Sequence, residues 1–141
     1  MTNKLKYIYN KFLSIINNLY LNSVIKSSSD YWEYRYKKGY DSGRGSYGKF
    51  SDIKSENINN FISKYNIKDV IEFGCGDGNQ LINIKYENYI GYDVSKTIID
   101  IVKEKFKHKQ KWKFDLMENY DSKKATLTVS LDVIYHLVED K

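Results

Sequence analysis

The sequence predicts an α/β fold with a doubly wound, mainly parallel sheet and N-terminal helices before it. Two observations support this prediction. Four short apolar runs, over residues 70–73, 89–93, 112–114 and 127–131, have the length of buried strands. Segments in which apolar residues recur at helical spacing lie before the first run and between the second and third. Strands that alternate with helices at this spacing form parallel sheets through right-handed crossovers.

Residues 1–29 are predicted to contain an amphipathic helix, over residues 3–25. Lysine and asparagine occupy one face of this helix, and the other face carries Ile8, Phe12, Ile15, Ile16 and Leu19. The weak charge of the polar face favours a helix packed on the domain, or a lid over it, above a helix on an anionic membrane. No run approaches the ~18 apolar residues of a spanning helix, and the polar interruptions argue against a signal peptide. We therefore expect no spanning membrane segment and a cytoplasmic location.

Residues 30–50 are predicted to form a cap segment rich in aromatic residues and glycine. Its aromatic part contains Tyr31, Trp32, Tyr34 and Tyr36, and four glycines follow between residues 39 and 48. Glycines at this density predict tight turns or flexibility. The next helix is predicted to begin after an N-cap at Ser51, and its apolar face is predicted to consist of Ile58, Phe61, Ile62 and Tyr65.

Residues 51–141 are predicted to form the main domain. A short helical turn is expected near residues 80–84, and Ser95 is expected to cap the helix between the second and third strands. The core face of that helix is predicted to be Ile98, Ile99, Val102 and Phe106. Residues 133–141 look like the opening of a further helix. Because four strands alone leave an exposed sheet edge, we expect either a second copy of the chain to cover it or this sequence to be the front part of a longer one.

Composition argues against several classes of function. The 141 residues contain no proline, which excludes collagen-like and proline-rich sequences. The single cysteine, Cys75, cannot form an internal disulfide or a thiolate cluster, and two histidines argue against a histidine-rich metal centre. The net charge of +5 favours anionic surfaces. Only Arg35 and Arg44 supply guanidinium groups, so we interpret the lysines as solvated faces and expect no nucleic-acid partner.

The most informative run is Glu72-Phe73-Gly74-Cys75-Gly76-Asp77-Gly78, at the end of the first predicted strand. Glycines allow the sharp turn out of the strand, and without a Cβ atom they let a ligand lie against the backbone. The turn leads to a helix N-terminus, which favours a carboxylate or phosphate. Glu72 adds a negative charge beside the turn, which suits a ligand that also carries a cation.

Two further acids follow the next strands. Asp93 ends the second strand, 21 residues after Glu72, where an acid can accept both ribose hydroxyl groups of a nucleoside; alternatively, it caps the following helix. Asp115 lies just past the third strand, either beside an adenine amino group or in a polar loop. A nicotinamide or flavin fingerprint requires a third glycine where Asn79 stands, so a dinucleotide is not expected.

The order and spacing of these motifs resemble those of class I S-adenosylmethionine-dependent methyltransferases of the small-molecule type. The resemblance covers roughly residues 50–141 and rests on residues 72–78, 89–95 and 127–136. In addition, residues 32–39, Trp-Glu-Tyr-Arg-Tyr-Lys-Lys-Gly, are similar to a motif that precedes the core in many such enzymes. The resemblance implies a Rossmann-like fold that lacks its C-terminal part and has its first four strands only. It also implies S-adenosylmethionine as the cofactor.

The resemblance further implies roles for individual residues. Glu72 and the glycine turn would meet the methionine amino group, and Asp93 would meet the ribose hydroxyl groups. Asp115 with Leu116 would border the adenine, and residues 130–132 would lie near the methyl group. The candidate cofactor-binding residues are Glu72, Gly74, Cys75, Gly76, Gly78, Asp93, Val94, Asp115, Leu116, Leu131, Trp32 and Arg35.

Two of these candidates have simpler interpretations. Arg35 either binds a carboxylate of substrate or cofactor or pairs with Glu33 or Asp41 on the surface. Cys75 is interpreted as packing, because a small side chain is needed inside the turn. A nucleophilic role for it would require a base or a cation nearby, and the sequence offers none.

The catalytic candidates are His136 and Asp132. Methyl transfer from a sulfonium is an in-line displacement, and a hydroxyl or amine acceptor can also require a base, which a histidine oriented by an acid provides. Alternatively, Asp132 caps the last helix and His136 is merely exposed. Aromatic residues between 31 and 47 would either wall the sulfonium or pack in the core. We expect a small-molecule methyl acceptor; the alternative is a non-catalytic fragment or binding module that retains the S-adenosylmethionine site.

Overall fold

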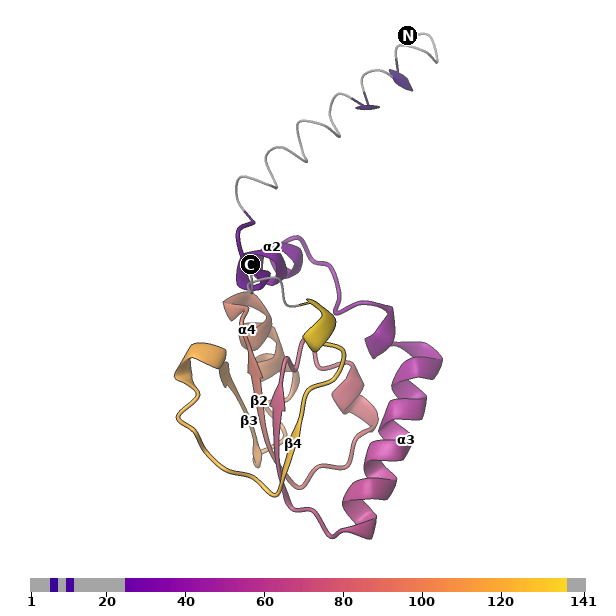
Figure 1. Ribbon diagram of the computed structural model, residues 1–141, viewed down its shortest axis with the longest axis vertical. Coiled ribbons are helices and arrows are strands. Elements are labelled where there is room, and N and C mark those ends of the chain that lie inside the picture. Colours follow the sequence, from indigo (N-terminus) through magenta and orange to yellow (C-terminus); the bar gives the residue numbers. More distant parts are fainter. Residues whose placement is uncertain (1–5, 8–9, 12–24, 137–141) are drawn as a thin grey trace.

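The structure is a computed structural model that describes residues 6–7, 10–11 and 25–136 (Figure 1). The predicted N-terminal helix over residues 3–25 therefore lies almost entirely outside the described residues, as does the chain after residue 136. The strands are β1 (Asp69–Phe73), β2 (Asn88–Asp93), β3 (Trp112–Leu116) and β4 (Leu127–Val129). The helices are α2 (Ser28–Lys37), α3 (Gly48–Lys64) and α4 (Lys96–Lys105), with short 3-10 helices η1 (Arg44–Ser46), η2 (Gln80–Asn83), η3 (Met117–Asn119) and η4 (Ile134–His136).

The four strands form one parallel sheet in the order β3-β2-β1-β4. Ile71 of β1 is in register with Ile90 of β2 on one side and with Thr128 of β4 on the other. These pairings confirm the predicted α/β class and parallel sheet. The strand order reverses between β1 and β4, because β2 and β3 both lie on the other side of β1. Loops that leave the carboxyl ends of two such strands diverge and open a crevice between them.

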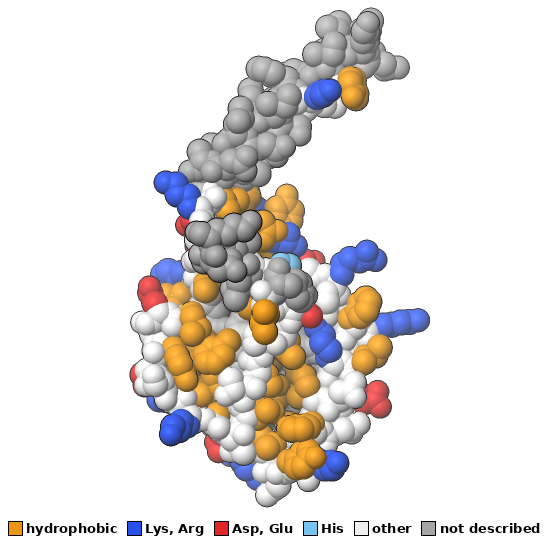
Figure 2. Space-filling view, viewed as in Figure 1, with side chains coloured by type: hydrophobic (Ala, Val, Ile, Leu, Met, Phe, Trp, Pro, Cys, Tyr) orange, Lys and Arg blue, Asp and Glu red, His pale blue; other side chains and the backbone are white. Residues whose placement is uncertain are grey.

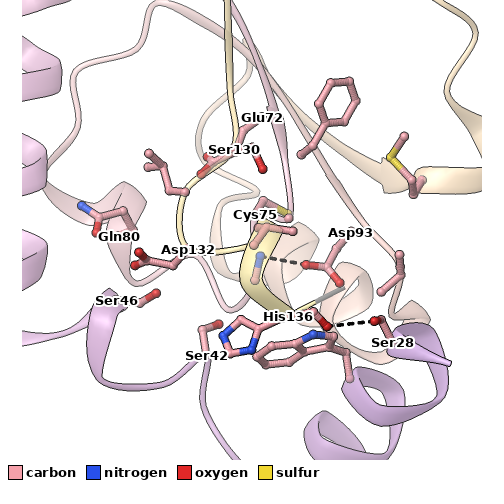
Figure 3. Close-up of a pocket in the computed structure, with 18 of the residues that line it drawn as sticks. Ser28, Ser42, Ser46, Glu72, Cys75, Gln80, Asp93, Ser130, Asp132 and His136 are labelled. Atoms are coloured by element: carbon pink, nitrogen blue, oxygen red, sulfur yellow. Dashed lines mark hydrogen bonds between the residues drawn. The ribbon is translucent and has the colours of Figure 1, made fainter. Parts of the chain in front are cut away.

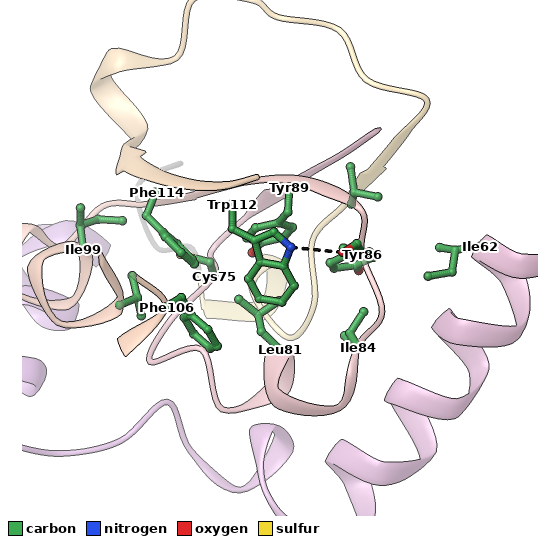
Figure 4. Packing of buried hydrophobic residues seen from close by; sticks show 12 residues of the cluster. Ile62, Cys75, Leu81, Ile84, Tyr86, Tyr89, Ile99, Phe106, Trp112 and Phe114 are labelled. Carbon is green, nitrogen blue, oxygen red and sulfur yellow. Dashed lines mark hydrogen bonds between the residues drawn. The ribbon is translucent and has the colours of Figure 1, made fainter. Parts of the chain in front are cut away.

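The hydrophobic core lies on one face of the sheet, beneath α3, η2 and α4 (Figure 4). Side chains alternate between the two faces along a strand, and Val70, Tyr89 and Trp112 belong to the core face. The ring of Tyr86 stacks on Tyr89 with centroids 5.2 Å apart, and Phe106 packs against Trp112 at 5.3 Å. The Trp112 indole also donates a hydrogen bond to the carbonyl of Tyr86 at 3.2 Å. Burial of these large rings is a main source of the stability of the fold.

Helix α4 confirms its prediction. Ser95 is the N-cap, and its hydroxyl accepts a hydrogen bond from the backbone N–H of Ile98 at 3.2 Å. The predicted core face is fully buried and consists of Ile98, Ile99, Val102 and Phe106. The short helical turn predicted near residues 80–84 is also present, as η2.

Helix α3 differs from its prediction at its start and on its apolar face. It begins at Gly48, so Ser51 lies buried in the first turn and is not the N-cap. A φ of +54° at Gly48 lets the chain turn into the helix four residues earlier than an N-cap at Ser51 would place its start. Of the four apolar residues predicted for its core face, Ile62 is buried and Ile58 packs against the core, whereas the other two are exposed.

Helix α2 lies over the carboxyl edge of the sheet (Figure 1). The carboxylate of Glu33 docks it onto the start of α4, where it accepts hydrogen bonds from the hydroxyls of Ser95 and Thr97 at 2.6 and 2.8 Å. The backbone N–H of Thr97 donates to the same carboxylate at 3.1 Å. None of the described helices has the length and apolar character required to cross a membrane.

Candidate functional site

A cavity of about 310 Å³ opens at the carboxyl edge of the sheet (Figure 3). Its walls come from the cap segment, the glycine turn after β1 and the segment after β4. Volumes of this order are typical of small-molecule sites. Ten of the predicted site residues line it: Trp32, Glu72, Gly74, Cys75, Gly76, Asp93, Val94, Leu131, Asp132 and His136.

The glycine turn forms the floor of the cavity. Gly74 and Gly76 have φ values of +81° and +53°, in the left-handed region that favours glycine. The backbone N–H groups of Gly74 and Cys75 both donate to the carbonyl of Tyr92, at 2.8 and 3.0 Å, which fixes the turn against β2. A Cβ atom on Gly74 would overlap the side chain of Val133. The chain after β4 therefore lies directly on this turn.

Asp93 is buried in the cavity wall at the end of β2. Its carboxylate accepts hydrogen bonds from the backbone N–H groups of Gly76 and Ser95, each at 3.0 Å. Burial raises the pKa of Asp93, and these hydrogen bonds oppose that effect. The bond to Ser95 resembles the predicted capping role, but the N-cap of α4 is Ser95 itself. Asp93 thus links the glycine turn to α4 and remains at the cavity surface.

Glu72 lies deeper in the same wall, with only 2% of its surface exposed. Its carboxylate accepts a hydrogen bond from the hydroxyl of Tyr89 at 2.6 Å. Burial raises the pKa of Glu72 to about 7, although the Tyr89 hydrogen bond and the charge of Lys54 act in the opposite direction. The group therefore changes its charge near neutral pH.

The two catalytic candidates both line the cavity but are held by different partners. Asp132 forms an ion pair with Lys54 of α3, and its φ is +58°. The ring of His136 contacts Trp32 edge-on with centroids 5.3 Å apart. The carboxylate of Asp132 thus pairs with Lys54 rather than with the ring of His136. Lys54 carries no sequence signal that would have revealed this contact, because it lies 78 residues away in the chain.

Four predicted cofactor residues lie outside the cavity lining. Arg35 donates to the backbone carbonyl of Asp41 at 2.8 Å and pairs with its carboxylate at 3.3 Å, which is one of the two surface pairings considered for it. Gly78 packs under the ring of Phe106. Asp115 accepts hydrogen bonds from the backbone N–H of Leu116 and from the side chain of Asn119, both at 2.8 Å. The fourth of these residues, Leu116, is partly buried against the core.

Several lining residues were missed by sequence reasoning: Ser28, Tyr36, Ser42, Ser46, Phe73, Gln80, Met117, Val133 and Ile134. Ser42 is held by an acid of the glycine motif, because its backbone N–H donates to the carboxylate of Asp77 at 2.8 Å. The backbone N–H of Asp77 donates in return to the Ser42 hydroxyl at 2.8 Å. Tyr47 donates its hydroxyl proton to the same carboxylate at 2.8 Å. In the sequence, the only sign of these contacts to Ser42 and Tyr47 was the position of Asp77 within the glycine motif.

The lining is acidic. Its described residues include the three carboxyl residues Glu72, Asp93 and Asp132, of which Asp132 is paired with Lys54, and neither lysine nor arginine. Such a lining favours a ligand with positive charge. No three histidine, cysteine, aspartate or glutamate side chains among the described residues gather where they could hold a metal ion.

Comparison with known proteins yields no family for this chain. No family model matches the sequence, and no curated protein matches it. Function is therefore inferred from the residues and geometry of the site.

Proposed function

We propose that this protein is a class I S-adenosylmethionine-dependent methyltransferase that acts on a small-molecule acceptor. The observation that supports this most strongly is the pair of buried carboxyl groups, Glu72 and Asp93, on adjacent parallel strands beside a glycine turn. They lie near the point where the strand order reverses, which is where open α/β sheets bind ligands. S-adenosylmethionine carries a sulfonium and an ammonium against one carboxylate, so its net positive charge suits the acidic lining.

The strand order suggests how the cofactor would lie. Asp93 ends β2 on one side of β1, whereas Leu131 follows β4 on the other side. With the ribose on Asp93, the adenine would extend toward Val94 and Met117, and the amino-acid part toward the glycine turn and β4. Because Asp115 lies outside the lining, Met117 takes its place as the proposed neighbour of the adenine.

Methyl transfer requires the acceptor atom, the methyl group and the sulfur to lie in line. The segment after β4 would supply that geometry, because it brings His136 and Asp132 to the amino-acid end of the cavity. His136 would accept the proton released by a hydroxyl or amine acceptor. Trp32, whose ring contacts His136, would hold the imidazole and border the sulfonium. Asp132 would act through its ion pair with Lys54.

Calorimetric titration with S-adenosylmethionine and with NAD tests the cofactor. We expect S-adenosylmethionine to bind and NAD not to bind. Asp93→Asn removes the negative charge of the group that would accept hydrogen bonds from the ribose hydroxyls. It should therefore weaken the binding of S-adenosylmethionine at least about 10-fold. Asp100→Asn, at an exposed ion pair on α4, is the matched control, and its affinity for S-adenosylmethionine should stay within about twofold of that of the wild type. Binding of NAD alone, or unchanged affinity of Asp93→Asn, would contradict the proposal.

The alternative function is a binding module that holds S-adenosylmethionine without turning it over. The size of the cavity favours it, because about 310 Å³ lies at the lower end of the range for ligand pockets and leaves little room for an acceptor. Formation of S-adenosylhomocysteine in the presence of small hydroxyl and amine acceptors distinguishes the two functions. A methyltransferase should lose turnover in His136→Ala while keeping its cofactor affinity. A protein that binds the cofactor and yields no product is a binding module.

We also propose a cytoplasmic protein in which a second copy covers the sheet edge at β4. The one cysteine is free and buried, which fits a reducing compartment. Among the described strands β4 presents an unpaired edge, and Figure 2 shows hydrophobic side chains on the face that carries it. Sedimentation at increasing protein concentration should reveal a dimer; a monomer throughout would contradict this part of the proposal.

A further inference from the structure

The side chain of Gln80 has one polar atom for which the described part of the chain offers no partner. Gln80 lies in η2, lines the cavity and is only 5% exposed. Its amide nitrogen donates to the backbone carbonyl of Ser51 and to the hydroxyl of Ser55, each at 3.0 Å. Its carbonyl oxygen, Oε1, is buried and accepts no hydrogen bond from the described residues. The cavity wall therefore contains an acceptor that none of the described residues satisfies.

The partners of Gln80 fix which way its amide faces. The carbonyl of Ser51 can only accept, so the atom beside it must be the amide nitrogen. The hydroxyl of Ser55 gives its own hydrogen to that same carbonyl at 2.8 Å, so it also accepts from Gln80. A flipped amide would place its oxygen against both, and Oε1 is therefore held away from α3. A buried acceptor without a partner is destabilising, and a ligand that donates a hydrogen bond removes that cost.

The charge of the cavity indicates what kind of donor a ligand would present to Oε1 of Gln80. The described residues of the lining include the carboxyl groups of Glu72, Asp93 and Asp132, of which Asp132 is paired with Lys54, and neither lysine nor arginine. A carboxylate or phosphate has no hydrogen to donate to Oε1. A cationic N–H group is attracted by the same carboxyl groups and forms stronger hydrogen bonds than a neutral donor.

The position of Gln80 indicates which part of a ligand it meets. Lys54 lies between Ser51 and Ser55 on α3 and pairs with Asp132 after β4, so Gln80 is on the β4 side of the cavity. Figure 3 shows Gln80 on the same wall as Asp132. Asp93, at the end of β2, lies on the other side of β1. A nucleoside bound at Asp93 would thus direct its amino-acid substituent toward Gln80.

We infer that the carbonyl oxygen of Gln80 binds the ammonium group in the amino-acid part of S-adenosylmethionine. The inference rests on the proposed function and adds a specificity-determining residue to it. Gln80 makes the site select nucleosides that carry this ammonium group over those that lack it. The two contacts to α3 hold the amide in place before the ligand arrives, so little ordering is needed on binding.

Calorimetric titration with S-adenosylhomocysteine and with its deaminated analogue, in which hydrogen replaces the amino group, tests the inference. The wild-type protein should prefer S-adenosylhomocysteine by about 10-fold or more. Gln80→Met keeps the length of the side chain and removes both polar atoms, so it should reduce that preference at least about fivefold. Gln110→Met makes the same chemical change at an exposed position and should leave the preference unchanged.

The outcomes separate this inference from the proposed function. The inference is overturned if Gln80→Met prefers S-adenosylhomocysteine over the deaminated analogue as strongly as the wild type does, or if it loses affinity for both compounds equally. Either result leaves the cofactor assignment standing. Failure of S-adenosylhomocysteine to bind the wild-type protein contradicts the proposed function and the inference together. The preference is a ratio of two affinities of one folded protein, so lower stability alone does not change it. If Gln80→Met does not fold, the ratio of the two affinities is measured in Gln80→Leu instead, and the same reduction is expected.

Discussion

At the residue scale, the fold keeps two carboxyl groups out of water beside a turn that requires glycine. Glu72 has one hydrogen-bond donor, the hydroxyl of Tyr89, whereas Asp93 has two backbone donors. Burial raises the pKa of both groups. With one donor, the pKa of Glu72 reaches about 7, whereas the backbone donors partly offset the effect of burial on the pKa of Asp93. Stability and ligand binding are therefore both expected to depend on pH.

The pKa of Glu72 predicts a specific loss of stability as the pH rises. Its pKa is raised from 4.5 in the unfolded chain to about 7 in the folded one, so the folded protein holds an extra proton between these values. That contribution is fully present below pH 4.5 and is lost as the pH rises through 7. Glu72→Gln cannot ionise, so its free energy of unfolding should fall less than that of the wild type between pH 5 and 8, by roughly 2 to 3 kcal/mol. Urea denaturation at the two pH values measures the free energy of unfolding of both proteins. The same pH dependence in the wild type and in Glu72→Gln would contradict the prediction.

The glycine turn predicts unequal costs for two glycine-to-alanine changes. Gly39 has a φ of +76° and open space around it, so Gly39→Ala should cost only the backbone strain, about 1 to 2 kcal/mol. Gly74 has a φ of +81°, and a Cβ there would also overlap Val133. Gly74→Ala should therefore reduce the free energy of unfolding by roughly 1 to 3 kcal/mol more than Gly39→Ala. Equal losses in urea denaturation would show that the segment after β4 does not rest on the turn.

At the scale of elements, two acids tie the cap segment to the sheet. Glu33 joins α2 to the start of α4, and Asp77 joins the loop at Ser42 and Tyr47 to the glycine turn. Both contacts link residues at least 30 positions apart in the chain. They place Trp32 over the cavity, so the cap segment and the cofactor site are expected to be lost together.

Replacing Glu33 should therefore affect both stability and binding. Partial burial raises the pKa of Glu33, but hydrogen bonds from Ser95 and Thr97 outweigh that effect and lower it to about 2. Its contribution is present above pH 4.5 and declines as the pH falls toward 2. At pH 7, Glu33→Ala should cost about 1 kcal/mol, as for the loss of a helix cap, and the difference from the wild type should shrink toward pH 3.

The matched control for Glu33→Ala is Glu104→Ala. Glu104 is exposed at the other end of α4, and within the described part of the chain it forms an ion pair with Lys107. This substitution should change the free energy of unfolding by less than about 0.5 kcal/mol. Thermal and urea unfolding compare the two variants, and similar effects would mean that Glu33 does not dock α2. S-adenosylmethionine titration of both should show weaker binding for Glu33→Ala alone.

At the scale of the whole molecule, the sequence predicts what local patterns determine. Strand β1, the glycine turn and the cap of α4 by Ser95 follow from neighbouring residues, and the acids Glu72 and Asp93 follow from their spacing. The ion pair between Lys54 and Asp132 could not be predicted, because it forms only once α3 packs beside the segment after β4.

The wrong and missing predictions have the same physical origin. Ser51 carries a capping signal, yet Gly48 starts the helix earlier and tertiary packing buries the serine. Gln80 gives no signal in the sequence, since its unpaired carbonyl is recognisable only when Ser51 and Ser55 occupy its nitrogen. Local propensity thus defines the sheet and the turn, whereas the wall of the site is set by contacts between distant elements.

The most direct test of the central claim is a crystal structure of the protein with S-adenosylhomocysteine. We predict the ligand in the cavity at the carboxyl ends of β2, β1 and β4, with its ribose hydroxyl groups on the carboxylate of Asp93 and its ammonium group on the carbonyl of Gln80. A ligand bound elsewhere, or one reversed so that its adenine meets Asp132, would contradict this account.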